Sequence, residues 1–153
     1  MRLVVDINVL ARAHPRALGP ARRLLESLWL GPHVLIFSDE MFQELERVLL
    51  YPRMLRRSGL TPDEIARFLW EVVEHADIVR PSAVPVGLVR DPTDDPVLGT
   101  ALAGRADILC TNDRDFWDEP VRDFAREHGI RIMSDLDLLA MLDELAGRKG
   151  PSS

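Results

Sequence analysis

The chain has 153 residues, of which 46% are hydrophobic and 29% charged, a globular composition that excludes a disordered chain. A chain of this length forms one domain and buries about two thirds of the surface that its unfolded form exposes. Its single cysteine, Cys110, excludes an internal disulfide and fits a reducing compartment, and a net charge of −6 gives no overall attraction to nucleic acid.

The first half of the chain alternates short apolar strands with amphipathic helices. Residues 2–6 (RLVVD) have the composition of a buried strand, and a helical turn follows over 7–14. Apolar residues at helical spacing predict a helix over 20–30. Residues 33–37 (HVLIF) form a second predicted strand, and a helix that opens with a serine cap covers 39–50.

The second half continues the same alternation. A threonine cap and early acids predict a helix over 62–75, which a loop and short strand follow at 76–90. A helix then runs from 95 to about 104 and leads into a strand over 107–111. The remaining predicted elements are a helix over 120–128, a strand over 130–133, a helix over 135–146 and a disordered tail over 147–153.

This alternation predicts an α/β fold with a mainly parallel sheet covered on both faces. In such sheets, ligands bind beyond the carboxyl ends of the strands. No signal peptide is visible, because Asp6 interrupts the first apolar run, and no run approaches the roughly 20 apolar residues of a membrane helix. We therefore expect a soluble, cytoplasmic protein without membrane association, whose domain spans residues 1–146.

Acidic side chains follow two of the predicted strands where these end. Asp6 ends the first strand and Asp113 follows the strand at 107–111, so both are expected at the same rim of the sheet. Asp94 and Asp95 begin the helix that leads into this strand and can reach the same rim. Asp95 also suits a helix cap and Asp113 a turn, whereas Asp6 has no evident structural duty.

Glu44 is a further candidate on the helix over 39–50. At 100° per residue it falls about 40° outside the apolar face, closer to that face than Glu40 or Glu46. Such an acid is either a surface residue or part of a polar site. Carboxylates that converge on one point repel one another unless a cation neutralises them, and Mg²⁺ prefers oxygen ligands of this kind. A cation held there can activate water and orient a phosphodiester for hydrolysis.

Three segments together resemble the motifs of PIN domains, including VapC-type toxins. VVDINVLARA at 4–13 resembles the opening motif, and SDEMFQELERVL at 38–49 resembles the second, with Glu44 as its helical acid. RDPTDDPVLGTALAGRADILCTNDRDF at 90–116 resembles the third and fourth motifs, in which an acid opens a helix and a strand ends in Thr-x-Asp. The four motifs occur in the family's order.

The resemblance implies a three-layer α/β/α sandwich with metal-dependent endoribonuclease activity, using Mg²⁺ or Mn²⁺. It assigns catalysis and metal binding to four acids, with Asp95 preferred to its neighbour because a cap position would aim it at the rim, and Asp91 as a further candidate. The four acids are Asp6, Glu44, Asp95 and Asp113. The supporting residues are Asn8, Thr111, Asp94 and Asp115.

The resemblance also implies partners. It suggests an RNA substrate, the toxin role in a bacterial toxin–antitoxin pair, a protein antitoxin that blocks the acids, and a homodimer supported by Trp29, Phe68 and Trp70. Arginine-rich segments without acids at 12–23 and 47–57 are candidates for RNA contacts or for ordinary solvated helix faces. The candidate RNA-binding residues are Arg12, Arg53, Arg56 and Arg57.

Two other functions compete with the nuclease. A non-catalytic PIN-like module that binds RNA or protein would be expected to lack one or more acids, and all four positions are acidic here. A phosphatase or receiver-like α/β enzyme would share an acid after the first strand but needs a lysine near the phosphate. The only lysine is Lys149, in the predicted tail, which argues against that alternative.

Overall fold

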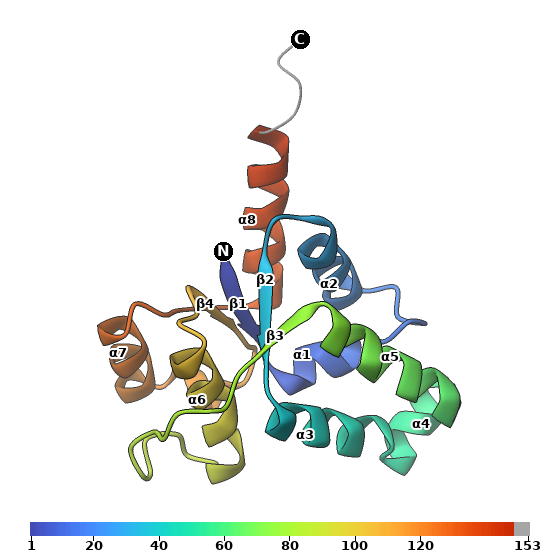
Figure 1. Cartoon of the computed structure of the whole chain (residues 1–153), viewed down its shortest axis with the longest axis horizontal. Coiled ribbons are helices and arrows are strands. Elements are labelled where there is room, and N and C mark those ends of the chain that lie inside the picture. Colours follow the sequence, from blue (N-terminus) through green and yellow to red (C-terminus); the bar gives the residue numbers. More distant parts are fainter. Residues whose placement is uncertain (149–153) are drawn as a thin grey trace.

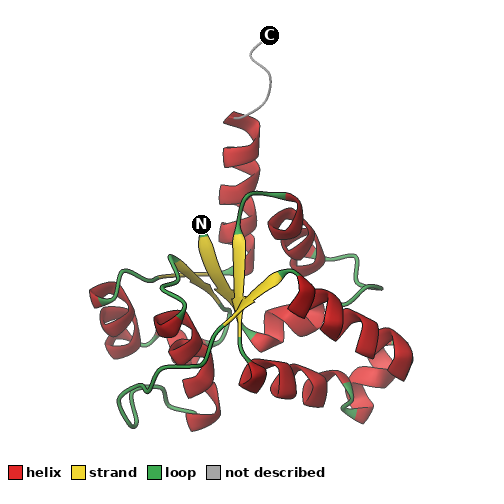
Figure 2. Cartoon of the chain, in the orientation of Figure 1, coloured by secondary structure: helices red, strands yellow, loops and turns green. Residues whose placement is uncertain are grey.

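Short parallel strands form the centre of the structure, a computed structural model described for residues 1–148 (Figures 1 and 2). All the strand pairs within these residues are parallel, in the order β3-β2-β1-β4-β5. The strands are β1 (Arg2–Val5), β2 (Val34–Phe37), β3 (Ala76–Ile78), β4 (Ile108–Cys110) and β5 (Arg131–Met133). The predicted parallel sheet is therefore confirmed.

Helices connect the strands and cover both faces of the sheet. They are α1 (Ile7–Arg12), α2 (Pro20–Leu30), α3 (Asp39–Leu49), α4 (Pro52–Ser58), α5 (Pro62–Glu74), α6 (Asp95–Ala103), α7 (Glu119–Glu127) and α8 (Asp135–Arg148). Two short 3₁₀ turns, η1 (Pro92–Asp94) and η2 (Arg114–Trp117), precede α6 and follow β4. The result is the expected three-layer α/β/α sandwich.

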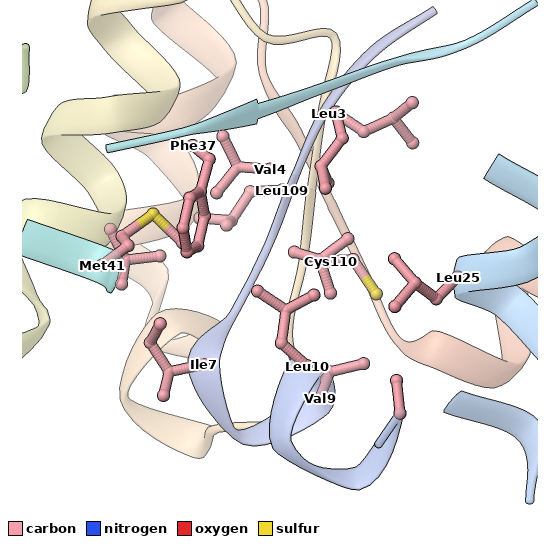
Figure 3. Close-up of a cluster of buried hydrophobic side chains, with 14 of the residues drawn as sticks. Leu3, Val4, Ile7, Val9, Leu10, Leu25, Phe37, Met41, Leu109 and Cys110 are labelled. Carbon is pink, nitrogen blue, oxygen red and sulfur yellow. The ribbon is translucent and has the colours of Figure 1, made fainter. Parts of the chain in front are cut away.

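The central strands β1 and β4 are apolar, apart from Arg2 at the start of β1, because both of their faces are covered. Val4 pairs in register with Leu109, and both are fully buried. Figure 3 shows Leu25 of α2 beside Cys110, on one side of the sheet. On β2, Ile36 instead lies so close to Gly104 at the end of α6 that a Cβ there would come within 2.5 Å of Ile36 Cγ2. This close approach requires glycine and fixes α6 against the sheet.

Helix α4 was not predicted from the sequence. It buries none of its residues, so it has no apolar periodicity by which to recognise it. Its punctuation was visible, because Pro52 occupies its first turn and Gly59 ends it with a left-handed φ of 70°. Figure 1 shows α3, α4 and α5 projecting together to one side of the sheet.

The capping expectations are confirmed. Ser38 Oγ accepts a hydrogen bond from the backbone N–H of Met41 at the start of α3. Thr61 and Glu64 form a reciprocal capping box at the start of α5. These caps satisfy backbone donors that the first helical turn leaves free.

Three expectations about the chain ends and surfaces need comment. Helix α8 continues through Gly147 and Arg148, two residues beyond the predicted end of that helix, and the rest of the predicted tail, 149–153, lies outside the described residues. Phe68 is fully buried and cannot serve a dimer contact, Trp29 packs on the core and stacks on His75, and Trp70 is 60% exposed. No helix within residues 1–148 is long and apolar enough to cross a membrane.

Candidate active site

Asp6 occupies the point where β1 ends and α1 begins, and only 3% of its surface is exposed. Its Oδ1 accepts a hydrogen bond from the N–H of Ile7 at 2.7 Å, and its Oδ2 accepts one from the Thr111 hydroxyl at 2.8 Å. Burial raises the pKa of Asp6, an effect that these hydrogen bonds oppose and the nearby charge of Asp113 reinforces. The carboxylate is thus fixed and isolated from bulk water.

Thr111 organises the segment that follows β4. Besides donating to Asp6, its fully buried hydroxyl accepts a hydrogen bond from the N–H of Asp113 at 3.0 Å. Asp113 is the N-cap of η2, and its carboxylate accepts a hydrogen bond from the N–H of Asp115 at 2.9 Å. Trp117 Nε1 donates to the Thr111 carbonyl. One threonine therefore contacts both the acid that follows β1 and the acid that follows β4.

Asp94 lies at the N-cap position of α6, but its carboxylate makes no capping hydrogen bond. Asp94, Asp113 and Asp115 each offer one oxygen, and these oxygens lie within 4.8 Å of one another. Partial burial, followed by the charges of Asp6 and Asp113, raises the pKa of Asp94 to about 7. We refer to Asp94, Asp113 and Asp115 as the aspartate cluster.

Asp95 does not take the position expected of it. Asp95 is the first residue of α6 rather than its N-cap. The turn η1 ends at Asp94, and Asp94 therefore takes the N-cap position. The Oδ1 atom of Asp95 is buried and has no hydrogen-bond partner within residues 1–148. Asp91, the other candidate, instead caps η1 by accepting hydrogen bonds from the N–H and hydroxyl of Thr93. The cap interpretation of Asp95 was therefore wrong, and Asp94 is the acid of the pair that faces the others.

A cavity of about 330 Å³ lies at this rim and collects most of the predicted residues. Asp6, Asp94, Asp113, Glu44 and Asn8 all line it. Asp115 and Asp95 are not among its lining residues, although Asp115 belongs to the aspartate cluster. The side chain of Asn8 makes no hydrogen bond to Asp6, whose position depends on Thr111 and the backbone instead.

Glu44 enters the cavity from α3 and is paired with an arginine. Both nitrogens Nε and Nη2 of Arg47 donate to the Glu44 carboxylate, the former at 3.0 Å. This ion pair between residues three apart on one helix face is largely exposed. Arg47 also lines the cavity, so the acidic rim carries one basic side chain.

The family is decided by sequence. A family model described as a PIN domain matches residues 2–115. The chain belongs to the PIN-domain family. No curated protein matches the sequence.

Two solved structures are similar to this PIN domain. A chain from VapBC2 of Rickettsia felis, crystallised with a promoter DNA fragment, has a TM-score of 0.56 at 16% identity, over 88% of this chain and 98% of that one. A chain from VapBC-1 of nontypeable Haemophilus influenzae has a TM-score of 0.49 at 15% identity, over 89% and 99%. At such identities the first of these establishes the shared architecture.

The donor set of this PIN domain fits a hard divalent cation. The aspartate cluster supplies oxygens alone, and the cavity lining contains no cysteine and no histidine, so the donors are the set that Mg²⁺ and Mn²⁺ accept. Burial first, and then the neighbouring carboxylates, raise the pKa of Asp94, so its ionised form is unfavourable in the cation-free cluster. A divalent cation would stabilise that ionised form.

Residues that the sequence interpretation missed also lie at this site. Glu40 lines the cavity one helical turn before Glu44, a position that the i, i+4 spacing could have suggested. Asp135, at the start of α8, is only 5% exposed and pairs with Arg12 at 3.5 Å, while its N–H donates to the side chain of Asn112. No local pattern joins Arg12 to Asp135, so only the fold reveals this contact. Arg12, a predicted RNA contact, is therefore engaged by a buried acid.

Proposed function

We propose that this PIN domain is a metal-dependent endoribonuclease that hydrolyses RNA phosphodiester bonds. The observation that carries the proposal is the buried Asp6 carboxylate, fixed by two donors, beside three aspartate oxygens that lie within 4.8 Å of one another. A protein has little structural reason to concentrate acids in this way, since their mutual repulsion costs stability. The cost is offset when the acids hold a cation.

The proposed ligands of Mg²⁺ or Mn²⁺ are Asp94 and Asp113, with Asp115 or Asp6 completing the set. The geometry supports Asp94 in place of Asp95 as the third acid, because Asp94 lines the cavity and belongs to the cluster. When bound there, the cation would lower the pKa of a water molecule and neutralise phosphate charge. Asp94, with its pKa of about 7, would release its proton as the cation binds.

The other residues of the site prepare the phosphodiester for attack. Glu44 and Glu40 line the α3 side of the cavity, where they can accept a hydrogen bond from the attacking water. Water attacks phosphorus, a new P–O bond forms, and the bond to the leaving ribose oxygen breaks with transfer of a proton to that oxygen. Thr111 keeps Asp6 and Asp113 in fixed positions throughout, a positioning role.

We propose further that the protein is the toxin component of a bacterial toxin–antitoxin pair. The fold shared with a chain of the VapBC2 complex supports this setting. An antitoxin would block the site by placing a cationic side chain among the carboxylates, as arginine pairs well with them. Homodimer formation would use Trp70, the predicted dimer aromatic that is exposed.

The test is cleavage of a mixed single-stranded RNA by the purified protein in EDTA, Mg²⁺ and Mn²⁺, beside the Asp6→Asn protein. Metal-dependent cleavage that the substitution abolishes is the expected result. Matched melting curves show whether Asp6→Asn is folded. Cleavage in EDTA, or full activity of a folded Asp6→Asn protein, would contradict the proposal, and binding without cleavage would indicate a non-catalytic module.

A further inference from the structure

A second hollow adjoins the acidic cavity on the projecting arm of α3 and α4. It measures about 420 Å³ and is lined by Arg47, Val48, Tyr51, Arg53, Met54 and Arg57. We refer to these residues as the arginine groove. Its lining contains three arginines and no acid, in a chain whose net charge is −6. A groove with this charge is complementary to a polyanion.

Two of the three arginines of the groove, Arg53 and Arg57, are available for a ligand, whereas Arg47 pairs with Glu44. Arg53 and Arg57 make no ion pair or side-chain hydrogen bond within residues 1–148, in contrast to the paired Arg12 and Arg16. Helix α4, which carries them, buries none of its residues. Its cationic face therefore contributes little to folding stability, and its charges remain free to contact phosphates.

Tyr51 adds an aromatic surface to the groove. It is 57% exposed, and its hydroxyl makes no hydrogen bond in the described part of the chain. Its backbone is extended at the start of α4, a conformation that the following Pro52 favours. An exposed aromatic ring among arginines suits the stacking of a nucleobase.

The arginine groove and the acidic cavity share a wall. Arg47 and Val48 line both hollows, and Glu44, on the same helix as Val48, lines the cavity. A polynucleotide that occupied the groove would thus pass directly into the cavity where Asp6 lies. Because of this shared wall, we interpret the arginine groove as a binding surface rather than as an ordinary solvated helix face.

We propose that the arginine groove binds single-stranded RNA beside the scissile phosphodiester, with Tyr51 stacking one unpaired base and Arg53 and Arg57 contacting phosphates. This inference rests on the proposed nuclease function and specifies its substrate as unpaired. A base that stacks on Tyr51 must leave the stack of neighbouring bases. In a duplex this costs free energy, because the base must be unstacked and unpaired. Arg56 lies on the same helix but is not in the groove lining, so it has no role in the binding.

The test measures binding apart from cleavage. A fluorescein-labelled, unstructured RNA of about ten nucleotides, sized to the reach of a single-strand site, is titrated by anisotropy into the Asp6→Asn protein in Mg²⁺, over a range of salt concentrations. Arg53→Ala/Arg57→Ala should weaken binding and lower the salt slope by about 1.4, that is 0.7 for each of two phosphate contacts. Arg56→Ala, matched in charge and helix, should leave the slope unchanged.

The stacking partner is tested in the same assay. Tyr51→Ala should lower affinity about 10-fold, whereas Tyr51→Phe, which keeps the ring, should not. Trp70→Ala removes an exposed aromatic that is outside the groove and should leave affinity unchanged. The same RNA annealed to its complement should bind more weakly than the single strand.

Each alternative outcome overturns one proposal and not the other. If the wild-type protein cleaves RNA while Arg53→Ala/Arg57→Ala and Tyr51→Ala keep wild-type affinity and kcat/KM, the arginine groove is not the binding site. Equal or tighter binding of the duplex would equally overturn the single-strand assignment. If the variants lose binding as expected and the wild-type protein cleaves nothing, the groove stands and the nuclease proposal fails.

Discussion

The acidic cavity and the arginine groove lie on opposite sides of a shared wall and are built in opposite ways. In the cavity, the carboxylates of Asp6 and Asp113 each accept a backbone N–H, and the Thr111 hydroxyl bonds the Asp6 carboxylate and the N–H of Asp113. In the groove, Arg53 and Arg57 have no partner within residues 1–148 and lie on a helix with no buried residue. The acids of the cavity are therefore held in place close to one another, whereas these two arginine side chains of the groove are unrestrained by partners.

This difference matches the tasks that we assign to the two regions. Metal ligands and reacting groups must be held to within fractions of an ångström, so they occur where strands end and the core fixes the backbone. Phosphate contacts tolerate variation in length and direction, so long side chains on an exposed helix are sufficient. Substitutions in the cavity should therefore affect stability and metal binding together, whereas those in the groove should affect RNA binding alone.

The largest effect is expected for Thr111→Val. The substitution keeps the shape but removes the donor to Asp6 and the acceptor for the N–H of Asp113, leaving buried polar groups unsatisfied. We expect the free energy of unfolding to fall by about 1–3 kcal/mol and the Mn²⁺ affinity, measured by calorimetry, to fall about 10–100-fold.

Thr100→Val is the matched control for that substitution. Thr100 is also fully buried, but its hydroxyl donates to the Pro96 carbonyl, forms a hydrogen bond with the Ser38 hydroxyl and touches no acid. It should cost comparable stability and leave the Mn²⁺ affinity unchanged. Equal losses of metal affinity in both variants would show that Thr111 acts through general stability rather than by positioning the acids.

Arg12→Ala should have the next largest effect, on stability rather than on RNA binding. The substitution leaves the buried carboxylate of Asp135 without its cationic partner. Because Arg12 itself is about half exposed, solvent screening limits the expected loss to roughly 1 kcal/mol of unfolding free energy, measured by urea titration. Arg23→Ala removes an arginine from an exposed pair with Asp143 and should change stability little. An RNA affinity that fell as much as in Arg53→Ala/Arg57→Ala would return Arg12 to the binding surface.

Asp94→Asn should stabilise the cation-free protein in a pH-dependent manner. The folded-state pKa of Asp94, about 7, is above the ordinary value of 3.8, so the proton is bound more tightly in the folded protein. The stabilising contribution of that proton is complete below pH 4 and is lost as the pH rises through 7. In EDTA, the melting temperature of Asp94→Asn should therefore exceed that of the wild type increasingly from pH 4 to 7 and reach a plateau above pH 7.

Asp91→Asn is a control of opposite sign. Hydrogen bonds from the N–H and hydroxyl of Thr93 lower the pKa of Asp91, so its charged form stabilises the fold above pH 4. The substitution should lower the melting temperature by a similar small amount at every pH from 5 to 8. A pH-independent gain in Asp94→Asn would mean that burial and the neighbouring carboxylates do not destabilise the ionised form of Asp94.

The sheet and most helices could be predicted because local patterns specify them. Apolar β-branched runs identified the strands, and the caps at Ser38 and Thr61 marked two helices. The rim position of Asp6 and Asp113 followed from the rule for parallel sheets. In the neighbouring doublet, however, a single turn of η1 decides which acid faces the others, and no sequence pattern specified that turn.

Helix α4 and its groove could not be predicted for a related reason. Secondary structure is read from the burial of apolar residues, and α4 buries none. The sequence showed arginines without acids at 47–57, but it could not say which of them face one hollow. Separating Arg53 and Arg57 from Arg56 requires the position of the helix on its neighbour α3.

The smallest and most discriminating effect is expected for Arg47→Gln, because Arg47 belongs to both regions. Its guanidinium pairs with Glu44 in the cavity and lines the arginine groove. Since the pair is exposed and lies within one helix, melting curves should change little. Removing the one positive charge of the cavity lining should raise Mn²⁺ affinity, while its loss from the groove should lower RNA affinity and leave the salt slope, which Arg53 and Arg57 set, nearly unchanged. The two affinities, measured on the same protein, should move in opposite directions by a few fold. If both fell together, Arg47 would be holding Glu44 in its binding position, and the cavity and groove would act as one cooperative site rather than two adjoining ones.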